Sequence, residues 1–379
     1  MRITGSVSRM AASLTVPVAL AATGLLLGGG VATAATAARG LPEHPAATAD
    51  VMASHVTWHK LSLLHGWVSG ESTYGTGNPA WAVKGGVVYL SGSVIQRSGT
   101  NQVVAVLPPA ARPTRVLWIS VYTLDDSHGF VTIYPTGELY ATATPQSNAR
   151  GYTSLAGISY PAGGTKAHKL VLRNGWKSSQ SQWNSGDPAY SLINGVVHLS
   201  GSLHRASGSN RLFAILPPGA RSAHVLYLSV YTYRGSTGVL KIATNGDMSM
   251  YLGRATAYTS LASITFPVHV TGSHQLALID GWKSSQSEYN SGNPSYSVSG
   301  GIVYLSGSLH QVSGSDDAFA TLPAAARPAH ELYISTYTLD GAVGTVFISP
   351  AGTMEVYAPD YTDAQDYSSL ASISYPLGS

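Results

Sequence analysis

One stretch of about thirty residues recurs along the chain and constrains its fold more than any other feature. Residues 175–204 return at 281–310 with 21 of 30 positions identical, and a looser copy runs from Gly66 to Ser93. The Gly-Trp pair that opens each copy stands at 66, 175 and 281, so the copies are 109 and 106 residues apart. A unit of this length can bury its own core, which predicts three tandem domains rather than the turns of a solenoid.

The N-terminus has the pattern of a secretory signal. Arg2 and Arg9 precede an apolar run over 14–27, and small residues at 32–37 suit a cleavage site. The run is short for a membrane span, which takes about 20 apolar residues, and no later segment is apolar enough to cross a bilayer. We therefore expect a secreted protein without a membrane span after signal removal. Its expected parts are a signal peptide at 1–37, an Ala- and Pro-rich leader at 38–57, and repeats at 58–165, 166–270 and 271–379.

Within each unit the pattern predicts short strands joined by tight turns. Gly-Gly or Asn-Gly pairs tolerate the positive φ of hairpin turns, and the strand at 303–309 alternates apolar and polar residues. No helix is expected. The sequence thus predicts an all-β chain of three tandem antiparallel β-sandwich domains, jelly-roll-like in their strand order. The expected hairpin turns are at 85–86, 194–195 and 300–301, with a second set at 136–137, 245–246 and 351–352.

Three short motifs in each unit carry a resemblance. In the third unit, Gly-x-Val-Tyr-Leu-Ser-Gly-Ser-Leu stands at 301–309, Leu-Pro-x-x-x-Arg-Pro at 322–328 and Tyr-x-Ser-Leu-x-x-Ile-Ser-Tyr at 367–375. This order resembles the β-sandwich, receptor-binding domains near the ends of phage tail-fibre proteins. The second unit departs from it, with Ser222 in place of proline. The resemblance implies attachment to surface glycans or proteins, often by a trimer, here by a secreted bacterial protein that uses the same module.

Composition narrows the possible partners. Charged residues make up 10% of the chain and the formal net charge is +3, with no basic stripe, so nucleic acid is not an expected partner. The chain has no cysteine, which excludes disulfides, thiolate metal sites and a cysteine nucleophile. A hydrophobic fraction of 44% is enough for folded cores.

Residues that recur in all three units do not form a catalytic set. Ser91, Ser200 and Ser306 recur, but no acid and histidine recur with them to make a triad. Acidic residues do not recur as the pair that a glycoside hydrolase needs. We therefore expect no enzyme activity and no cofactor.

The recurring aromatic residues suggest a binding loop. Trp67, Trp176 and Trp282 follow an apolar strand and are expected in the core. A second aromatic comes seven residues later in each unit, in a polar and glycine-rich segment, followed by Asn or Asp before proline. Flat rings beside planar polar groups suit sugar recognition, although Asn or Asp before proline also simply initiates turns. The candidate ligand-binding residues are Tyr74, Asn78, Trp183, Asp187, Tyr289 and Asn293.

One histidine recurs as well, at His59, His168 and His274, eight residues before each tryptophan. The plain interpretation is a solvated residue at the start of a strand. The alternative requires the units to pack around a pseudo-threefold axis, where the three imidazoles would converge on one divalent ion.

These observations leave three functional hypotheses. The first is a secreted, non-enzymatic protein that binds polysaccharide or glycosylated cell surfaces through the repeated loops, with avidity from three sites. The second is a structural protein of an extracellular assembly, in which the units pack as an intramolecular pseudo-trimer with the loops as interfaces. The third is a secreted hydrolase with an unrecognised site. Loop aromatics facing solvent would favour the first, and the same rings buried between units the second.

Overall fold

Antiparallel strands build every sheet of the chain, which confirms the all-β prediction. The computed structural model describes residues 56–125, 127–251, 255–268 and 272–379, all within the unit 47–379. The predicted signal peptide at 1–37 lies outside the described residues, as does the leader apart from its last two residues. Among the described residues, no helix has the length and apolar character needed to cross a membrane.

The first repeat folds into two sheets. The smaller sheet has the order β1-β3-β4-β11 and the larger one β2-β5-β10-β7-β8-β9-β6. A bridge between Leu63 and Ala105 brings the segment before β2 beside β6, so the larger sheet curls back toward its own first strand. The strands are β1 His59–Lys60, β2 Trp67–Ser69, β3 Ala80–Lys84, β4 Val87–Ser91, β5 Ser93–Gln96, β6 Val103–Val106, β7 Leu117–Thr123, β8 Ser127–Ile133, β9 Glu138–Ala143, β10 Thr153–Ser154 and β11 Ser159–Pro161.

The second repeat has the same strand order, with the larger sheet divided into β13-β16-β21 and β17-β20-β19-β18. A bridge from Thr232 to Thr259 links the two parts. Its strands are β12 His168–Lys169, β13 Trp176–Ser178, β14 Ala189–Ile193, β15 Val196–Ser200, β16 Ser202–Arg205, β17 Leu212–Ile215, β18 Leu226–Tyr231, β19 Thr237–Ile242, β20 Asp247–Tyr251, β21 Thr259–Ser260 and β22 Thr265–Pro267.

In the third repeat the larger sheet is divided in the same way, into β24-β27-β32 and β28-β31-β30-β29. A bridge from Thr338 to Ser368 links these two parts. Its strands are β23 His274–Gln275, β24 Trp282–Ser284, β25 Ser295–Ser299, β26 Ile302–Ser306, β27 Ser308–Gln311, β28 Ala318–Thr321, β29 Leu332–Tyr337, β30 Val343–Ile348, β31 Thr353–Tyr357, β32 Ser368–Ser369 and β33 Ser374–Pro376. Both predicted sets of hairpins are present, because β3–β4, β8–β9 and their counterparts pair as antiparallel neighbours.

Short helices, which the sequence did not predict, interrupt the strands. One turn of helix follows β2, β13 and β24, and each of these turns ends at a left-handed residue, Gly75, Asn184 or Asn290. Helices of four to six residues are too short to show a 3.6-residue apolar period. The helices are α2 Glu71–Tyr74, α3 Gln146–Gly151, α4 Gln180–Trp183, α5 Gln286–Tyr289 and α6 Tyr361–Asp366; the 3-10 turns are η1 Pro109–Ala111, η2 Pro218–Ala220, η3 Tyr233–Gly235, η4 Ala324–Ala326 and η5 Leu339–Gly341.

Each repeat has its own hydrophobic core, centred on the tryptophan of the Gly-Trp pair. Trp67, Trp176 and Trp282 are only 3%, 4% and 3% exposed and lie in three separate clusters. In each case the indole N–H donates to a backbone carbonyl 34 residues along the chain, at 2.9 Å. These tryptophans are core residues, as the sequence predicted.

The Ser-Gly-Ser segment near the end of the recurring stretch touches the Asp-Pro or Asn-Pro turn in its middle, which gives a physical reason for its recurrence. Gly201, in Ser-Gly-Ser, has φ +82°, and a Cβ there would lie 2.1 Å from the carbonyl oxygen of Asp187. In the other two repeats, a Cβ at Gly92 or Gly307 would likewise lie too close to the carbonyl oxygen of Asn78 or Asn293. Only glycine fits this close approach, so the turn and the glycine must recur together.

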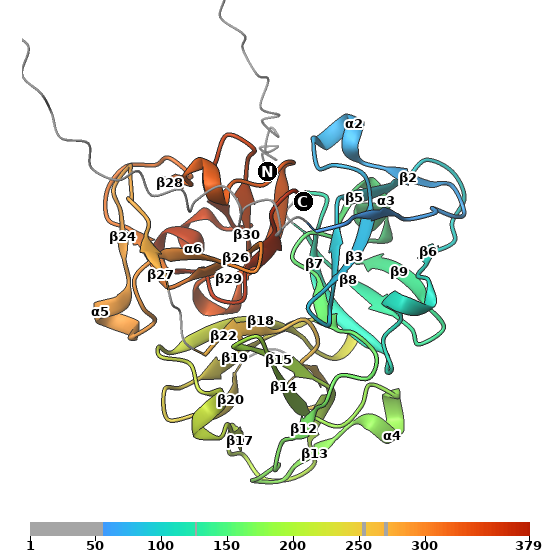
Figure 1. Ribbon diagram of the computed structural model, residues 1–379. Coiled ribbons are helices and arrows are strands. Elements are labelled where there is room, and N and C mark those ends of the chain that lie inside the picture. Colours follow the sequence, from blue (N-terminus) through green and yellow to red (C-terminus); the bar gives the residue numbers. More distant parts are fainter. Residues whose placement is uncertain (1–55, 126, 252–254, 269–271) are drawn as a thin grey trace, which may run out of the picture. The chain divides into compact units, whose positions relative to one another are not determined.

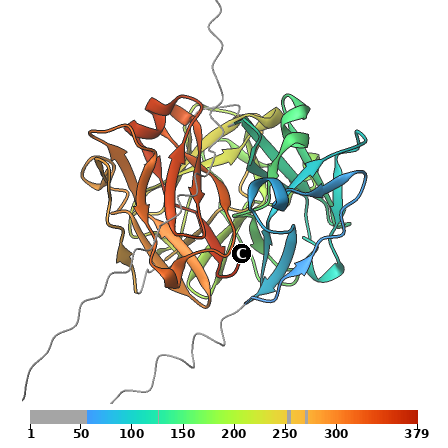
Figure 2. The same cartoon turned by 90° about the horizontal axis from the view of Figure 1, so that it is seen from above.

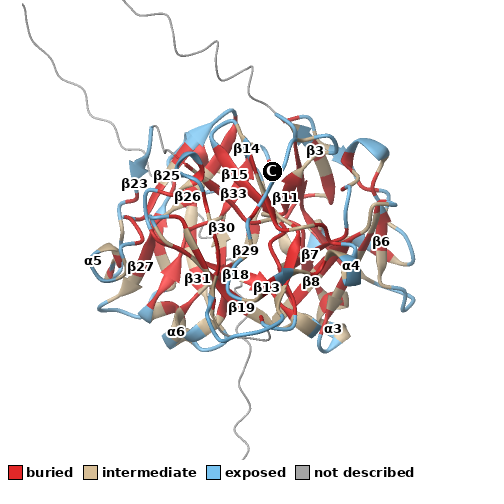
Figure 3. Ribbon diagram, turned by 90° about the horizontal axis from the view of Figure 1, so that it is seen from below, coloured by how far each residue is buried: buried red, intermediate tan, exposed pale blue. Residues whose placement is uncertain are grey.

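The three repeats also contact one another. Strands β7, β18 and β29 pack together pairwise where the repeats meet (Figure 1). Figure 2 shows the same cartoon from above, with repeat 3 in orange and red beside repeat 1 in blue and green. Buried residues continue from the strands of each repeat into this central region (Figure 3). In a further cluster, Val87 and Tyr89 of repeat 1 pack with Ile302 of repeat 3. Each repeat thus contacts both others, and the three make a closed ring.

Candidate binding clefts at the seams between repeats

The recurring loop lies where two repeats meet. We call the contact between one repeat and the loop of the next a seam. At each seam a backbone N–H of one repeat donates to the carbonyl of the residue that caps the short helix of the other. The pairs are Val116 to Asn184 at 3.0 Å, Val225 to Asn290 at 2.9 Å and Glu331 to Gly75 at 3.0 Å. The loop therefore docks the same way three times.

Four aromatic rings pack at each seam, and we call each set a tetrad. In the seam between repeats 1 and 2, Trp118 meets Trp183 edge-on at 5.8 Å and Tyr258 at 5.5 Å. Edge-to-face pairs at such distances stabilise beyond the area they bury. The tetrads are Trp118, Trp183, Tyr231 and Tyr258; Tyr227, Tyr289, Tyr337 and Tyr367; and Tyr333, Tyr74, Tyr122 and Tyr152.

The tetrads change the interpretation of the three loop aromatics. Tyr74, Trp183 and Tyr289 are half-buried, with their rings packed on tetrad neighbours. The binding hypothesis expected these rings to face solvent as platforms for a sugar. Instead they fill the seams, because an apolar ring at a contact between repeats gains more from burial than from solvent.

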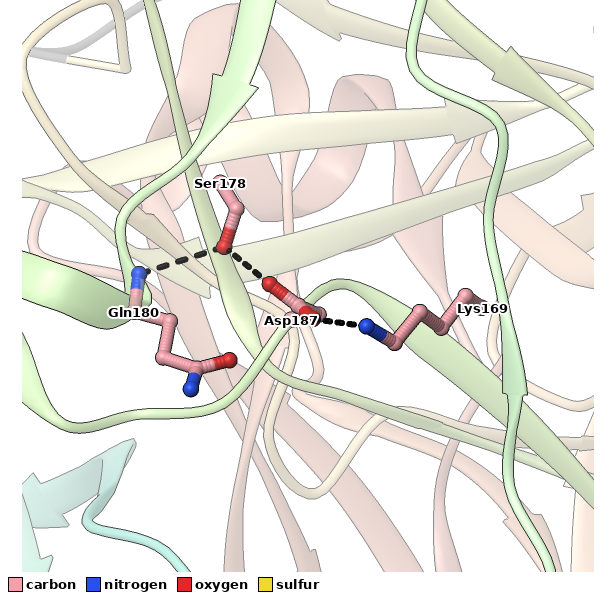
Figure 4. A network of polar contacts seen from close by, with 4 residues as sticks. All are labelled: Lys169, Ser178, Gln180 and Asp187. Atoms are coloured by element: carbon pink, nitrogen blue, oxygen red, sulfur yellow. Dashed lines mark hydrogen bonds and ion pairs between the residues drawn. The ribbon is translucent and has the colours of Figure 1, made fainter.

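Asp187 is the centre of a polar network on the loop of repeat 2 (Figure 4). Its carboxylate pairs with the ammonium of Lys169 at 2.6 Å and accepts a hydrogen bond from the Ser178 hydroxyl at 2.8 Å. Ser178 in turn accepts from the backbone N–H of Gln180 at 3.2 Å. Lys169, and then Ser178, hold the pKa of Asp187 below its usual value. The network fixes the shape of the loop and keeps a carboxylate at the cleft.

The counterparts of Asp187 behave differently. Asn293 is exposed and accepts from the Ser284 hydroxyl at 2.8 Å, which repeats the loop-shaping bond without the charge. Asn78 is half-buried beside Lys60 in the cleft between repeats 3 and 1. The structure therefore does not bring the six candidate residues together. It distributes them over three seams, one pair in each.

The three clefts beside these loops differ in size. The cleft between repeats 1 and 2 has a volume of about 390 Å³, against about 230 Å³ between repeats 3 and 1 and about 40 Å³ between repeats 2 and 3. Val268 and Phe266 line the smallest cleft, where the largest has Ala162 and Tyr160. Of these three, the largest alone falls within the roughly 300–1,000 Å³ typical of ligand sites.

Two cations distinguish the largest cleft, and the sequence had not singled them out. Arg115 and Lys169 both line it, together with Asp187 and Gln180. Arg115 donates to the side-chain oxygen of Asn184 at 3.3 Å, which directs its guanidinium along the seam. Alignment of the three units could have identified Arg115, because the other two units have His224 and His330 at its position. Gly186, Gly292 and Gly77 each pack on one of these three residues.

The recurring histidines do not converge. His59 stacks on Trp81 at 4.6 Å, His168 on Tyr190 at 5.2 Å and His274 on Tyr296 at 5.3 Å, each within its own repeat. Among the residues that the structure describes, no group of three or more His, Cys, Asp or Glu side chains is placed to hold a metal ion. Each imidazole instead covers the ring opposite it on the neighbouring strand, which is the arrangement of the plain interpretation.

Comparisons with known proteins assign the chain to no group. No protein-family model and no curated protein matches it. Among solved structures, the BP39L lectin from Burkholderia pseudomallei is 12% identical, with 80% of this chain and 83% of the lectin covered and a TM-score of 0.14. BBS1N in complex with ARL6DN is 11% identical, with 76% and 77% covered and a TM-score of 0.13. Likeness at this level supports no inference about fold or function.

Proposed function

We propose that the chain is a non-enzymatic binding protein, and that its ligand is a saccharide held in the cleft between repeats 1 and 2. The observation that carries the proposal is the cleft itself, about 390 Å³ and lined by Arg115, Gln180 and Asp187. A guanidinium, an amide and a carboxylate offer planar donors and acceptors, which suit the paired hydroxyls of a sugar ring.

The binding mode differs from the one that the sequence suggested. The aromatic of the loop, Trp183, packs in the tetrad, so polar groups rather than a stacked ring provide the contacts. Asp187 keeps acceptor capacity beyond its two bonds, because a carboxylate has about four lone-pair sites. Because only one of the three clefts has the size of a ligand site, we propose one binding site for each chain. The avidity expected from three equivalent sites is then absent.

The test is retention of the protein on insoluble polysaccharides and whole cell walls. Gln180→Ala and Asp187→Asn are expected to reduce retention about tenfold each, the effect of one or two lost hydrogen bonds. Asp187→Asn introduces the residue that repeats 1 and 3 carry naturally, so the loop is expected to fold.

Gln286→Ala is the matched control. It removes the same residue from the same position of the third repeat, where the cleft is only about 40 Å³. Retention is expected to stay at the level of the unmodified chain. Equal losses in Gln180→Ala and Gln286→Ala would contradict a site in the first seam, and no retention on any matrix would contradict saccharide binding.

A second candidate is a structural role in an extracellular assembly. The observation that favours it is the burial of the loop aromatics in all three seams, which joins the repeats as an intramolecular trimer. A closed ring of this kind suits a rigid building block. Absence of retention on every matrix, combined with self-association of the chain in sedimentation, would favour this candidate over the first.

Both candidates share the expectation of a secreted protein. It rests on the pattern of 1–37, where two arginines precede a short apolar run and small residues that suit a cleavage site. The resemblance to phage receptor-binding domains is likewise retained as a proposal, in the sense of surface attachment by a trimer-like module. Detection of the mature chain in culture medium, with an N-terminus near residue 38, tests the secretion part.

A further inference from the structure

Repeats 2 and 3 carry opposite charges, which the small net charge of the whole chain conceals. Residues 166–270 include ten Lys and Arg residues and two Asp and Glu residues, whereas 271–379 include two Lys and Arg residues and ten Asp and Glu residues. Among the described residues of these two repeats, Lys169 and Asp187 form the one ion pair. The two sets of charges therefore do not neutralise each other within the ring, although the repeats are neighbours.

Three cations of repeat 2 gather where β17 begins. We call them the basic edge: Arg173, Arg205 and Arg211. The backbone N–H of Arg173 donates to the carbonyl of Phe213 at 2.9 Å, and the Arg205 guanidinium donates to the carbonyl of Ser209 at 3.0 Å. The guanidinium groups of Arg205 and Arg211 lie 5.8 and 4.6 Å from the centroids of a tryptophan and a tyrosine ring. These contacts hold two cations in place before a partner arrives, which lowers the entropy cost of docking.

The same place in repeat 3 carries carboxylates instead. We call them the acidic edge: Asp280, Asp316, Asp317 and Glu355. One side-chain amide joins two of them, because Gln311 donates to the carbonyl of Asp280 at 2.9 Å and to that of Asp316 at 3.0 Å. Glu355 lies on β31, which pairs with β28. Burial, and then the carboxylates of Asp317 and Asp316, raise the pKa of Glu355, as expected where like charges lie close together.

The two edges share one backbone arrangement. Arg211 and Asp317 occupy the same position of their repeats, and repeat 1 has Gln102 there; all three carbonyls accept from the facing strand at 3.1 Å. Strands β17 and β28 lie at the ends of their sheets opposite β18 and β29, and so on the outer side of the ring (Figure 1). The edges are thus alike in shape, opposite in charge and open to a partner from outside.

We infer that the basic edge of repeat 2 is a docking surface for a second copy of this chain, which presents the acidic edge of its repeat 3. Opposite charges attract across such a contact. An anionic polymer suits the basic edge less well, because the acidic repeat of the same molecule repels it. Since the two edges are different surfaces, the contact is heterologous and copies add head to tail. The inference does not depend on a saccharide ligand, and it names the surface through which the assembly of the second candidate function would form.

Sedimentation velocity of the full chain, at protein concentrations up to about 1 mM, tests the inference. At about 0.01 M salt the average mass is expected to rise with concentration. At about 1 M salt it is expected to return to that of one chain, because the Debye length falls to about 3 Å.

Two charge reversals identify the edges. Arg211→Asp and Asp317→Arg each introduce the residue that the other repeat carries at that position, so both variants are expected to fold. Each alone is expected to weaken association at least about tenfold, since like charges then face each other. An equimolar mixture of the two variants is expected to restore association, because each supplies the charge that the other lacks. Failure of the mixture to associate would overturn the inference.

Two further variants are controls that are expected to leave association unchanged. Gln102→Asp places the same new residue on the uncharged counterpart in repeat 1, and Gln180→Ala alters the saccharide cleft, so this inference and the saccharide proposal can fail separately. Unchanged association in Arg211→Asp, or no rise in mass at low salt, would overturn the inference. So would a chain that stays single but is retained on alginate through Arg211, because the basic edge would then belong to an anionic polymer.

Discussion

The backbone N–H of Val116 donates to the carbonyl of Asn184, 3.0 Å away in the next repeat. The backbone of Asn184 has the left-handed conformation and ends a single turn of helix, which leaves its carbonyl at the end of the loop. The same bond recurs from Val225 to Asn290 and from Glu331 to Gly75. The recurring loop is therefore first a connector of repeats, and any ligand site is built on a seam that the connector has already made.

Trp183→Ala is expected to destabilise the chain. The substitution removes a half-buried ring from contacts with Trp118, Tyr233 and Tyr258. Removal of a fully buried tryptophan costs about 3–5 kcal/mol, so a half-buried one is expected to cost about 2 kcal/mol. Urea unfolding monitored by circular dichroism measures the change.

Trp183→Tyr is the control for this prediction, because tyrosine occupies the position in repeats 1 and 3. It keeps a ring in the tetrad and also removes the indole N–H, which is buried without a partner. We expect it to cost less than about 1 kcal/mol. Equal stability of Trp183→Ala and the unmodified chain would show that the tetrad does not hold the seam.

Gly292→Ala is expected to weaken the seam between repeats 2 and 3. A Cβ at this glycine would lie 2.7 Å from the ring of His224, and the backbone has φ +82°. The left-handed backbone alone costs about 1 kcal/mol for alanine, and the contact with His224 adds to it.

Gly86→Ala separates the two effects in the same experiment. Gly86 also has φ +82°, but a Cβ there would have no atom within 4 Å. The difference in unfolding free energy between the two variants therefore measures the seam contact. A Gly292→Ala variant as stable as Gly86→Ala would mean that His224 moves aside without cost.

The strands and turns were predictable because they depend on local pattern. Alternation around 303–309 and the Gly-Gly pair at 300–301 specify one hairpin, and the repeats confirm it twice more. The burial of Trp176 also followed from its apolar neighbours. These features need only the sequence of one repeat.

The seams were not predictable in the same way, because they join residues far apart in the chain. Nothing local to Trp183 indicates that it meets Trp118, and a polar loop of glycine and serine suggested exposure instead. Likewise, His198 gives no sign within β15 that it shares a cavity with Tyr89 and Tyr304. The one available signal is that the three occupy the same position of the repeat, which becomes informative only once the repeats form a ring.

Ser263 makes a contact between repeats that can be tested by two substitutions. Its hydroxyl accepts from the backbone N–H of Ser159 at 3.1 Å, and its own backbone has φ +65°. Ser263→Ala removes the acceptor and keeps the strained φ, at a cost of about 1–2 kcal/mol. Ser263→Gly also removes the acceptor but relieves the backbone, so it is expected to be more stable than Ser263→Ala by about 1 kcal/mol.

Repeat 1 supports this comparison, because it carries Gly157 at the position of Ser263. Chemical denaturation of both variants gives the ranking. If Ser263→Ala were the more stable variant, the positive φ of Ser263 would not be a strained conformation in solution.

Acid is expected to destabilise the ring through two histidines, His198, which is buried, and His128, which is half-buried. Burial lowers the pKa of both His128 and His198 to about 4, and His128 keeps one hydrogen bond, to the carbonyl of Val343 in the third repeat. Because the unfolded chain binds these protons near pH 6.5, stability is full above that pH and is lost as the pH falls from about 6.5 to about 4. The loss is expected to reach about 3 kcal/mol for each histidine. Unfolding free energies measured at several pH values test this.

His198→Tyr and His128→Thr isolate the two contributions, since each introduces a residue that another repeat carries at that position. Two carboxyl groups act in the opposite direction as the pH falls. Burial raises the pKa of Glu331 and Glu355, so their protonation favours the folded state. Both carboxyl groups are present in each variant and in the unmodified chain. Their contribution to the pH dependence of the unfolding free energy therefore cancels when the two are compared. Each variant is expected to lose about half of the acid sensitivity between pH 6.5 and 4. An unaltered pH profile in the double variant would mean that neither histidine stays neutral in the folded ring.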